Sequence, residues 1–477
     1  MKNKGSTNKN YEISTPRKLG YGIGTAGDSI SYTIFFTYFI FFLTDVIGVH
    51  PAMAGAIASV TMVCYAFAGP IIGYWSDNSK NPRGRRRPFM IGSMFPLAIV
   101  AAFLFFPVGL SGALQGAYYL VMAIILWVCY ALYVGPWGAL GAELTQDYTE
   151  RNIIRLCVGI CASPCLMMAQ SGTIGGVSVF QANGFPAGQS WFFSVSICAS
   201  IMLVLCFVSW MTTKGKEKII PEDTGVKFKF SFPDLFRQYA SFLKIKSYRT
   251  LIFFQFIYLI GYTLIMNNTV YSLSHLAGLS ESDQSVFWLV YSLVAVASLP
   301  IVTAIANKID KKTCIMFFSI VFIADCILFF TIGITSFATA YIYAIGVAFA
   351  TSSFWGVFYS LIYDCVELSE LVSGERREGG ILALSQLAQT LGGALASLIM
   401  GFVLSSFGYS GSGIEAETAK TGILLNSTLL PAILTAVSVF LLARYKVNKS
   451  RFDAVKQAIE DRKAGIEPKM DDFKDLI

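Results

Sequence analysis

The chain has little charge for its length. Asp, Glu, Lys and Arg make up 14% of the 477 residues, whereas about a quarter of the residues are charged in a typical soluble domain. Hydrophobic residues reach 55%, and the mean hydropathy is +0.60. This composition excludes a soluble globular fold, so we expect an all-α protein that crosses a lipid bilayer many times.

Positive charge is absent from almost every second loop. Hydrophobic stretches long enough to span a bilayer recur twelve times, and we count them as hairpins from a cytoplasmic start. Of the 36 Lys and Arg, 35 lie at the amino end, in or beside even-to-odd loops, or in the carboxyl tail, and only Lys420 lies on the other side. Because short cytoplasmic loops retain Lys and Arg, both termini are predicted to be cytoplasmic, in the cytoplasmic membrane of a bacterium. The predicted spans are residues 19–45, 51–76, 88–108, 115–141, 153–180, 189–213, 249–273, 284–307, 313–335, 338–364, 379–407 and 421–444.

The net charge of +7 follows from the same bias, and we therefore expect no nucleic-acid partner. The predicted partners are the lipid bilayer and a small-molecule substrate, with the protein acting as a monomer.

Histidine is almost absent. His50 and His275 are the only two, and both fall in predicted outer loops. No His or carboxylate completes a metal set beside the cysteines, and the sequence has no Ser-His-Asp set or phosphate-binding loop. We expect no enzyme activity, no metal and no cofactor other than a coupling proton.

The longest loop divides the spans into two sets of six. It covers residues 214–249 and carries nine Lys and Arg. Two six-helix bundles joined by a basic cytoplasmic linker are the layout of the major facilitator fold, in which the halves enclose a site at the membrane midplane. The predicted divisions are a cytoplasmic segment at 1–18, a bundle at 19–213, a linker at 214–248, a bundle at 249–444 and a cytoplasmic tail at 445–477.

Two cytoplasmic segments carry further predictions. Residues 232–247 are expected to form an amphipathic helix on the linker. The tail after Arg444 mixes both signs of charge, and we expect it to be solvated and partly disordered, with a helix as the alternative.

The loop after the second span combines a small residue, an acid and several Arg. It reads Gly73-Tyr-Trp-Ser-Asp77, followed by an Arg-rich turn that contains Arg85 and Arg87. A glycine allows two helices to approach closely, and an Asp at a helix end can pair with Arg from the loop or a neighbouring helix. We interpret Gly73, Asp77, Arg85 and Arg87 as a cytoplasmic latch that opens when the two halves separate. The alternative, that the Arg serve only membrane topology, leaves the Gly-xxx-Asp spacing unexplained.

Four segments along the chain carry a family resemblance. They are Gly20-Tyr-Gly-x-Gly24 with Thr44-Asp45-Val-x-Gly48, Gly73-xxx-Asp77 with Gly84-Arg85-x-Arg87-Pro88, Asp364-x-Val-Glu367-xx-Glu370-xxx-Gly374-x-Arg376-x-Glu378-Gly379, and Ala388-Gln389-x-Leu-Gly392-Gly393. Together they resemble the glycoside–pentoside–hexuronide:cation symporter family, to which melibiose permease belongs. The resemblance covers nearly the whole chain and implies a transporter of the major facilitator superfamily. It adds Asp364, Glu367 and Arg376 to the cytoplasmic gating residues.

The chain lacks the charged residues on which that family's cation site is centred. The resemblance places two Asp, four residues apart, on the second helix, where this chain has Tyr65 and Gly69. An expected Asp or Asn is also missing just before Pro136, and Thr390 stands where the family carries a Lys. A hard cation such as Na⁺ needs several oxygen ligands. Because the whole set is missing, we expect transport that is coupled to protons or uncoupled, and not coupled to Na⁺.

Three carboxylates remain at or near membrane depth. Asp28 lies about two turns into the first span, Asp325 lies near the middle of the ninth, and Glu143 lies near the inner end of the fourth. An unpaired ionised carboxylate is unfavourable in lipid, so these groups are candidates for proton binding. The alternatives are a structural hydrogen bond for Asp28 and a locally paired or neutral Asp325.

Two positions are the main candidates for substrate binding. The resemblance places a sugar-contacting Asp or Asn at Ser29, one residue from Asp28, so that either residue is a candidate. It also places a cavity-lining Trp at Trp355, and the flat face of such a ring suits the apolar C–H face of a sugar.

Five further residues are weaker substrate candidates. Some of them are polar side chains at membrane depth, which either line a cavity or join helices together. The five are Tyr65, Trp137 beside the proline of span four, Arg155 about three residues before the family's helix-five Arg, Asn268 and Gln389.

These features predict a secondary active transporter of a sugar-like solute, a glycoside or hexuronide, that works by rocking of the two bundles. The loss of polar residues from the cavity makes an amphipathic or apolar solute, such as a lysolipid or a steroid or aromatic conjugate, the alternative substrate. A membrane sensor that does not transport is the alternative from another class.

Overall fold

The computed structural model describes residues 13–79, 81, 84–145, 147–215, 231–375, 377–411, 417–464 and 470–477. Every regular element in these ranges is helical. Twelve helical stretches are long and apolar enough to cross a membrane, from Thr15–Val46 to Glu417–Ala443. The prediction of an all-α protein with twelve spans is confirmed. The side of the membrane that each terminus faces stays a prediction.

The helices form two compact units. One contains Met1–Phe39 and Cys64–Phe230, and the other contains Ile40–Val63 and Ser231–Ile477. The second unit therefore includes the tip of the first helical hairpin, although this tip belongs to the amino-terminal half of the sequence. The division into bundles at residues 19–213 and 249–444 stays a prediction.

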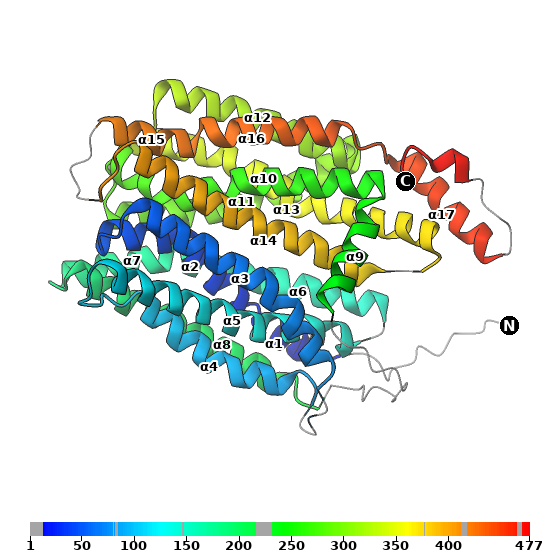
Figure 1. The fold of residues 1–477 in the computed structure, drawn as a ribbon, viewed down its shortest axis with the longest axis horizontal. Coiled ribbons are helices and arrows are strands. Elements are labelled where there is room, and N and C mark those ends of the chain that lie inside the picture. Colours follow the sequence, from blue (N-terminus) through cyan, green and yellow to red (C-terminus); the bar gives the residue numbers. More distant parts are fainter. Residues whose placement is uncertain are drawn as a thin grey trace. The chain divides into compact units, whose positions relative to one another are not determined.

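The first unit is built from the helices before the basic linker. Within it, α4 packs against α5 and α8, and α1 packs against α6 and α8 (Figure 1). The elements are α1 (Thr15–Ile23), α2 (Ala26–Phe41), α3 (Pro51–Asp77), α4 (Arg87–Leu104), α5 (Gly112–Leu144), α6 (Tyr148–Met167), the π-helical turn η2 (Met168–Gly172), α7 (Thr173–Ala182) and α8 (Ala187–Thr212). The last residues of α2 and the first half of α3 belong to the second unit.

The second unit contains the remaining helices, and α10 lies in its centre. Helix α10 packs against α14 and α16, while α13 packs against α11 and α12. The elements are the π-helical turn η1 (Phe42–Val46), α9 (Phe232–Leu243), α10 (Lys246–Tyr271), the π-helical turn η3 (Ser272–Leu276), α11 (Glu281–Ile309), α12 (Lys311–Ile332), α13 (Phe337–Ser373), α14 (Glu378–Ser406), α15 (Glu417–Ser427), α16 (Leu429–Ala443), α17 (Lys449–Lys463) and the 3₁₀ turn η4 (Met470–Phe473).

Local sequence signals set several helix ends. Ser280 and Asp283 form a capping box at the start of α11, in which each side chain accepts a hydrogen bond from the other residue's backbone N–H. Helix α13 ends at Ser373 and is capped by Gly374, whose φ of 75° lies in the left-handed region that favours glycine. Such caps matter here because hydrocarbon offers no partner to a free N–H or C=O group.

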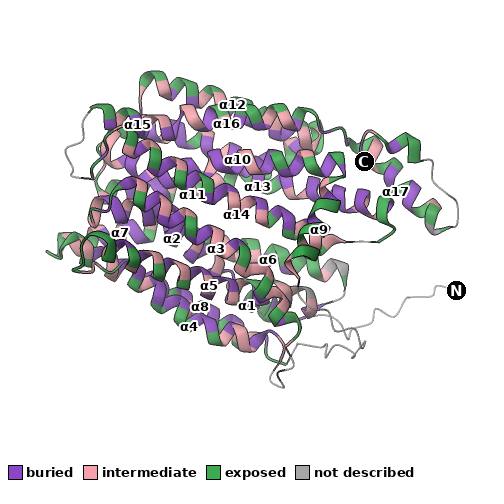
Figure 2. Ribbon diagram, viewed as in Figure 1, coloured by how far each residue is buried: buried purple, intermediate pink, exposed green. Residues whose placement is uncertain are grey.

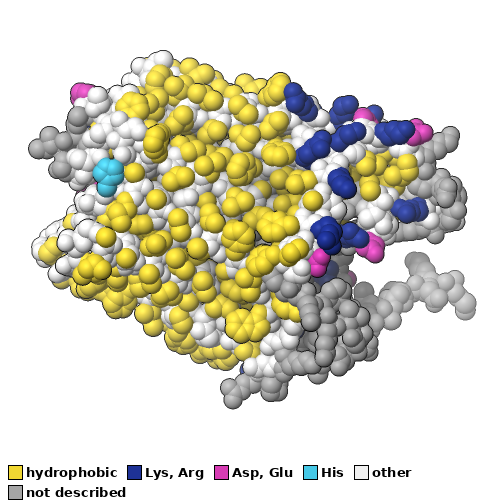
Figure 3. All heavy atoms as spheres, viewed as in Figure 1, with side chains coloured by type: hydrophobic (Ala, Val, Ile, Leu, Met, Phe, Trp, Pro, Cys, Tyr) yellow, Lys and Arg dark blue, Asp and Glu magenta, His cyan; other side chains and the backbone are white. Residues whose placement is uncertain are grey.

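Large apolar side chains cover much of the surface. Leu114, Phe402 and Trp75 are 69%, 67% and 62% exposed, and exposed residues alternate with buried ones along the helices (Figure 2). Figure 3 shows hydrophobic side chains over the helical body, with Lys and Arg gathered at the end where α17 lies. Lipid contact accounts for this apolar surface, as expected for membrane spans.

The linker helix predicted at residues 232–247 is present as α9, which ends at Leu243, whereas residues 246 and 247 begin α10. Its Phe242 ring packs onto α14 at Gly380, where an added Cβ would lie 2.7 Å from the ring. The amphipathic pattern therefore identified a helix that lies on the second unit.

The expectation of a solvated tail is wrong. Helix α17 packs against α13, where Arg462 donates a hydrogen bond of 2.8 Å to the carbonyl of Leu371. Leu476 is fully buried, and a hydrogen bond from Arg451 holds the pKa of the Asp475 carboxyl below its usual range. One face of α17 is apolar, and its residues Val455, Ala458 and Ile459 are buried. The many charged residues on the rest of the helix made this face hard to recognise in the sequence.

Two glycines bring α3 and α14 into backbone contact within the second unit. An added Cβ on Gly55 would lie 2.5 Å from the carbonyl oxygen of Ser397 and 2.9 Å from the Cα of Gly401. An added Cβ on Gly401 would lie 2.5 Å from the carbonyl oxygen of Pro51. Only glycine fits at either position without moving a helix.

We expect Gly401→Ala to lower the melting temperature of the purified protein in detergent. The added methyl group meets backbone that cannot move aside, and overpacking of this kind costs about 1–3 kcal/mol. The matched control is Gly92→Ala on α4, where an added Cβ meets nothing within 4 Å. Equal melting temperatures for Gly401→Ala and the unmodified protein would contradict the close contact.

Candidate functional site

A carboxylate and a group of aromatic rings meet in the first unit. Asp28 on α2 accepts a hydrogen bond of 2.5 Å from the hydroxyl of Tyr130 on α5. The Tyr130 ring centroid lies 5.4 Å from that of Tyr65 on α3 and 4.9 Å from that of Trp127. Asp28 and Tyr65 are half-buried, whereas Trp127 and Tyr130 are buried. These four residues, the Asp28 cluster, present a carboxylate and aromatic rings at an accessible position.

Two polar groups of the Asp28 cluster lack the usual protein partners. Among the described ion pairs, none includes Asp28, and the indole N–H of Trp127 has no partner within the described chain. A carboxyl in such surroundings is either uncharged or paired with a group from outside the protein. Trp127 was not predicted, although its spacing of three residues from Tyr130 on one span is a signal that could have identified it.

A second aromatic cluster lies in the second unit. The Trp355 ring on α13 lies 6.2 Å from Tyr262 on α10 and 6.2 Å from Tyr359, centroid to centroid. The Tyr359 hydroxyl donates a hydrogen bond of 3.2 Å to Oε1 of Gln389 on α14. All four residues are half-buried. The structure thus connects two predicted residues, Trp355 and Gln389, through Tyr359, and we call these four residues the Trp355 cluster.

Asn268 lies in a contact between helices. It is fully buried, and its Nδ2 donates to the carbonyl of Ile423 at 2.8 Å and to the hydroxyl of Ser427 at 2.5 Å. The prediction preferred a cavity-lining role for Asn268, but this geometry favours the alternative role, the joining of α10 to α15.

Three other substrate candidates occupy different surroundings. The Ser29 hydroxyl lies 3.2 Å from that of Thr25 on the same segment of chain. The Trp137 ring stacks on Tyr21 at 5.2 Å and its N–H donates to the Tyr21 carbonyl at 3.2 Å. Arg155 is exposed on α6. Ser29 and Trp137 therefore make internal hydrogen bonds, and substrate contact by these three residues stays a prediction.

Asp325 lies between α12 and α13. Its carboxylate occupies the space next to Gly346, where an added Cβ would collide with Oδ2. That oxygen has no hydrogen-bond partner among the described residues. The arrangement suits an uncharged carboxyl better than a local ion pair, because an ionised one would need a partner here.

The positions of the family's cation site are occupied differently here. Tyr65 contributes its ring to the Asp28 cluster, Gly69 faces open space, and the Thr390 hydroxyl bonds to the carbonyl of Gln386 on its own helix at 3.0 Å. The part of the chain that the structure describes contains no group of three His, Cys, Asp or Glu side chains suited to a metal.

Charged groups from three segments meet at the basic end of the first unit. Glu143 on α5 pairs with both Arg85 and Arg86, the latter at 3.1 Å. Arg86 also pairs with Asp77 at the end of α3, at 2.9 Å. We call these four residues the Glu143 cluster. Glu143 was predicted as a proton carrier, but two guanidinium groups already contact its carboxylate, which is 9% exposed.

Arg87 and Gly73, two members of the predicted latch, do not belong to the Glu143 cluster. Arg87 donates to the carbonyl of Trp210 on α8 at 2.7 Å and lies 4.5 Å from the centre of its ring, so that it anchors the start of α4. An added Cβ on Gly73 would meet nothing within 4 Å. The close helix approach expected at Gly73 is therefore not present in the first unit, because this face of α3 is open.

Of the predicted gating residues of the second unit, Asp364 forms an ion pair with Lys311, which was not predicted. Both oxygens of Asp364 on α13 accept hydrogen bonds from Lys311, at 3.0 and 2.9 Å. Glu367 is half-buried one turn further along α13. Arg376 lies outside the described residues.

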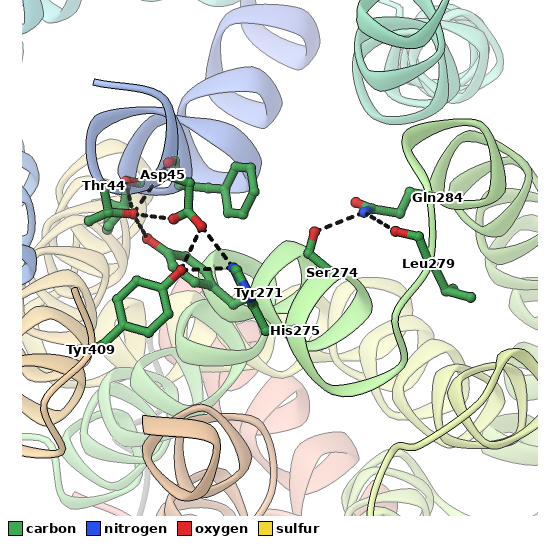
Figure 4. A network of polar contacts seen from close by, with 10 residues as sticks. Thr44, Asp45, Tyr271, Ser274, His275, Leu279, Gln284 and Tyr409 are labelled. Atoms are coloured by element: carbon green, nitrogen blue, oxygen red, sulfur yellow. Dashed lines mark hydrogen bonds and ion pairs between the residues drawn. The ribbon is translucent and has the colours of Figure 1, made fainter. Parts of the chain in front are cut away.

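A polar network that was not predicted joins the hairpin tip to the end of α10 (Figure 4). Asp45 Oδ1 accepts a hydrogen bond of 2.6 Å from Tyr409 and lies 2.7 Å from Nε2 of His275. Thr44 lies 2.6 Å from Asp45 Oδ2 and 2.6 Å from the Tyr271 hydroxyl. We call these five residues the Asp45 network. Only 11% of the Asp45 side chain and 14% of the His275 side chain are exposed.

The expectation that His275 lies in an outer loop is wrong, because it lies in the π-helical turn η3. The helix continues past the hydrophobic stretch, so hydropathy alone ended the span too early. The polar residues Ser272, Ser274 and His275 lie within the helical turn that hydropathy excluded.

Residues 20–449 match the family model of the MFS/sugar transport proteins. The chain belongs to this family. An uncharacterized symporter of Bacillus subtilis strain 168, YnaJ, is 25% identical over 97% of this chain and 98% of its own length. An isoprimeverose transporter of Lactiplantibacillus pentosus is 24% identical over 91% of this chain and 88% of its own length.

These matches confirm the glycoside–pentoside–hexuronide:cation symporter family that the sequence motifs indicated. The protein is therefore a multi-pass membrane protein of the bacterial cytoplasmic type and a secondary transporter. The crystal structure of the nucleoside transporter NupG has the same fold, with a TM-score of 0.60 and 16% identity over 92% of this chain and 99% of that one.

We expect Glu143→Gln to destabilise the MFS transporter strongly. The substitution leaves two partly buried guanidinium groups without their shared carboxylate, and loss of one partner from a buried charged group costs about 3–5 kcal/mol. The melting temperature in detergent measures the effect. The control is Glu375→Gln, since the Glu375–Arg377 pair is 68% and 39% exposed and such pairs contribute about 0–1 kcal/mol. Similar losses in the two variants would show that Glu143 does not hold the cluster together.

Proposed function

We propose that the protein carries a small sugar-like solute, a glycoside or hexuronide, across the membrane by alternating access. We further propose that transport is coupled to protons or uncoupled, and is not coupled to Na⁺. Family membership and the isoprimeverose transporter among the relatives support the sugar class. The observation that carries the proposal is the Asp28 cluster, because it combines an accessible carboxyl group with aromatic rings.

A sugar presents two kinds of surface, and the Asp28 cluster matches both. Its hydroxyl groups need hydrogen-bond partners, which the half-buried Asp28 carboxyl group provides. Its C–H faces pack on aromatic rings, and Tyr65 lies 5.1 Å from Trp127, centroid to centroid. Tyr130 fixes the carboxyl group through its hydrogen bond to Oδ1.

The Trp355 cluster repeats this combination in the second unit. It pairs a half-buried indole ring with the amide of Gln389, which Tyr359 orients through its hydroxyl. An aromatic ring beside a polar side chain is again suited to a sugar. We therefore propose the Trp355 cluster as a second substrate-binding surface.

The proposal against Na⁺ rests on the residues at the family's cation site. A phenol ring, a glycine and a hydroxyl that already bonds to its own helix stand at Tyr65, Gly69 and Thr390. These groups cannot supply the carboxylate oxygens that a hard cation needs. A proton needs only one acceptor, so the loss of these oxygens is compatible with proton coupling, and Asp28 and Asp325 stay candidates for it.

An amphipathic or apolar solute is the second candidate. The aromatic character of both clusters and the open space next to Gly69 favour it. Thermal stabilisation of the purified protein separates the two classes, because a ligand that binds only the folded protein raises its melting temperature. Stabilisation by a lysolipid or a steroid conjugate, and by none of a set of glycosides and hexuronides, would replace the sugar proposal.

We expect proteoliposomes that contain the protein to take up isoprimeverose, or another glycoside or hexuronide from a small panel, without Na⁺. An inward proton gradient should raise or leave unchanged the initial rate, and Na⁺ at fixed pH should not alter it. Asp28→Asn should lower the rate about tenfold or more, because a hydrogen bond to a charged group contributes about 1.5–3 kcal/mol.

The matched control for Asp28→Asn is Glu417→Gln, which changes an exposed carboxylate paired with Lys420 and should transport like the unmodified protein. A steep rise of uptake with Na⁺ concentration at constant pH would overturn the coupling proposal.

A further inference from the structure

We propose that His275, together with Asp45 and Tyr409, binds the proton that is transported with the solute, and that this proton strengthens the attachment of the hairpin tip to the end of α10 within the second unit. This inference deepens the proposed function and rests on its proton-coupled form. It concerns residues that the substrate clusters do not use, and it assigns the coupling proton to a site other than Asp28 or Asp325.

The acid and the base occupy matching positions at two helix ends. Asp45 lies in the π-helical turn η1 and His275 in the π-helical turn η3. Each precedes by three residues a glycine in the left-handed region, Gly48 with φ 79° and Gly278 with φ 64°. At both helix ends a backbone N–H donates to the carbonyl six residues earlier. Val49 donates to Leu43 at 2.7 Å, and Leu279 donates to Leu273 at 2.9 Å. Insertions that create π turns recur at functional sites.

The chemistry of the trio suits reversible proton binding. Histidine is the side chain whose ordinary titration falls between pH 5 and 8. Nε2 of His275 lies 2.7 Å from Asp45 Oδ1 and 2.8 Å from the Tyr409 hydroxyl, which also donates to Asp45 Oδ1. A proton taken up by the ring turns a hydrogen bond between a neutral ring and a carboxylate into one between opposite charges. Bonds of that kind are shorter and stronger, especially where water is mostly excluded.

The surroundings leave Asp45 as the acidic partner of His275. Tyr271 contacts the network through Thr44. On the neighbouring helices, Asp283 at the start of α11 bonds to Ser280 at 2.7 Å, and Glu417 on α15 pairs with Lys420 at 2.8 Å. Among the described residues, Asp45 is the carboxylate that contacts the imidazole ring.

The Asp45 network holds the hairpin tip in place, so stronger or weaker hydrogen bonds in it change how firmly the tip is attached. The hairpin tip, Ile40–Val63, belongs to the second unit, whereas the rest of α2 and α3 belongs to the first. The tip is attached by the side chains of Thr44 and Asp45, and by backbone contacts at Gly55 and Gly411. The proposal requires that this attachment form in one state of the transport cycle and break in the other. A proton that strengthens it therefore biases the equilibrium between the states.

The first test measures proton binding without any solute. The chain has two histidines, so nitrogen-15 NMR of histidine-labelled protein in detergent gives one pair of ring-nitrogen signals for each, and His50→Gln assigns them. We expect the His275 ring to change between the neutral and the doubly protonated form from pH 8 to pH 5.5. A ring that keeps one protonation state across this range would overturn the inference.

The second test asks whether this proton drives transport. In proteoliposomes, His275→Gln keeps a hydrogen-bonding group beside Asp45 but cannot gain a charge at these pH values. We expect it to lose the stimulation of isoprimeverose uptake by an inward proton gradient while it still exchanges labelled for unlabelled sugar. His50→Gln, at an exposed position before α3, should keep the stimulation.

The outcomes separate this inference from the proposed function. If His275→Gln retains the full stimulation by protons, the inference fails and proton-coupled transport stands. If the unmodified protein moves none of the sugars of the panel, the sugar proposal fails, and the NMR titration still decides whether His275 binds the proton.

Discussion

Hydrocarbon cannot solvate an unpaired charge, and the polar contacts of this transporter follow from that constraint. Near the ends of described spans, Arg85 and Arg86 share Glu143, and Lys311 binds both oxygens of Asp364. At membrane depth, the carboxyl group of Asp28 is hydrogen-bonded by a phenol rather than paired with a cation. Tyr65, Gly69 and Thr390 stand where the resemblance places the acids and the Lys of the family's cation site. The predicted loss of all three charges together agrees with this constraint, because a single remaining charge would be unpaired in the membrane.

The ion pairs of the two units and the Asp45 network differ in their chemistry. The Glu143 cluster and the Lys311–Asp364 pair join carboxylates to Arg or Lys, which remain charged between pH 5 and 8. The Asp45 network joins a carboxylate to a histidine and a phenol. Of these three groups, the Asp45 network is the one that contains a histidine, the residue type that commonly serves as a proton-dependent switch. In the proposed mechanism, a proton gradient acts on the attachment of the hairpin tip, while the Glu143 cluster and the Lys311–Asp364 pair keep the same charges.

The sequence was sufficient to predict the elements that depend on composition and local spacing. Hydropathy predicted the twelve spans, because any helix in lipid must be apolar over its full length. Family motifs led to Asp28 and Trp355, and aligning the second helix on its proline led to Tyr65. The amphipathic pattern predicted α9, and the same pattern in α17 was obscured by charged residues around Val455 and Ile459.

Contacts between distant segments could not be predicted in this way. Asp45 meets residues 230 and 364 positions further along the chain, and no periodicity relates such positions. The pairing of Asp28 with Tyr130 spans 102 positions and depends on how α2 and α5 pack. The open space at Gly73 likewise depends on which face of α3 meets a neighbour. Side-chain chemistry alone indicates which groups need partners, but tertiary packing decides which partners they find.

Direct measurement of proton movement with the sugar tests this mechanism best. Proteoliposomes loaded with a pH-sensitive dye, with equal pH on both sides and no Na⁺, would receive isoprimeverose outside. Proton-coupled transport through the Asp45 network predicts acidification of the lumen that begins with sugar addition and is absent with His275→Gln. Sugar uptake without acidification, or uptake that occurs only after Na⁺ is added, would contradict it.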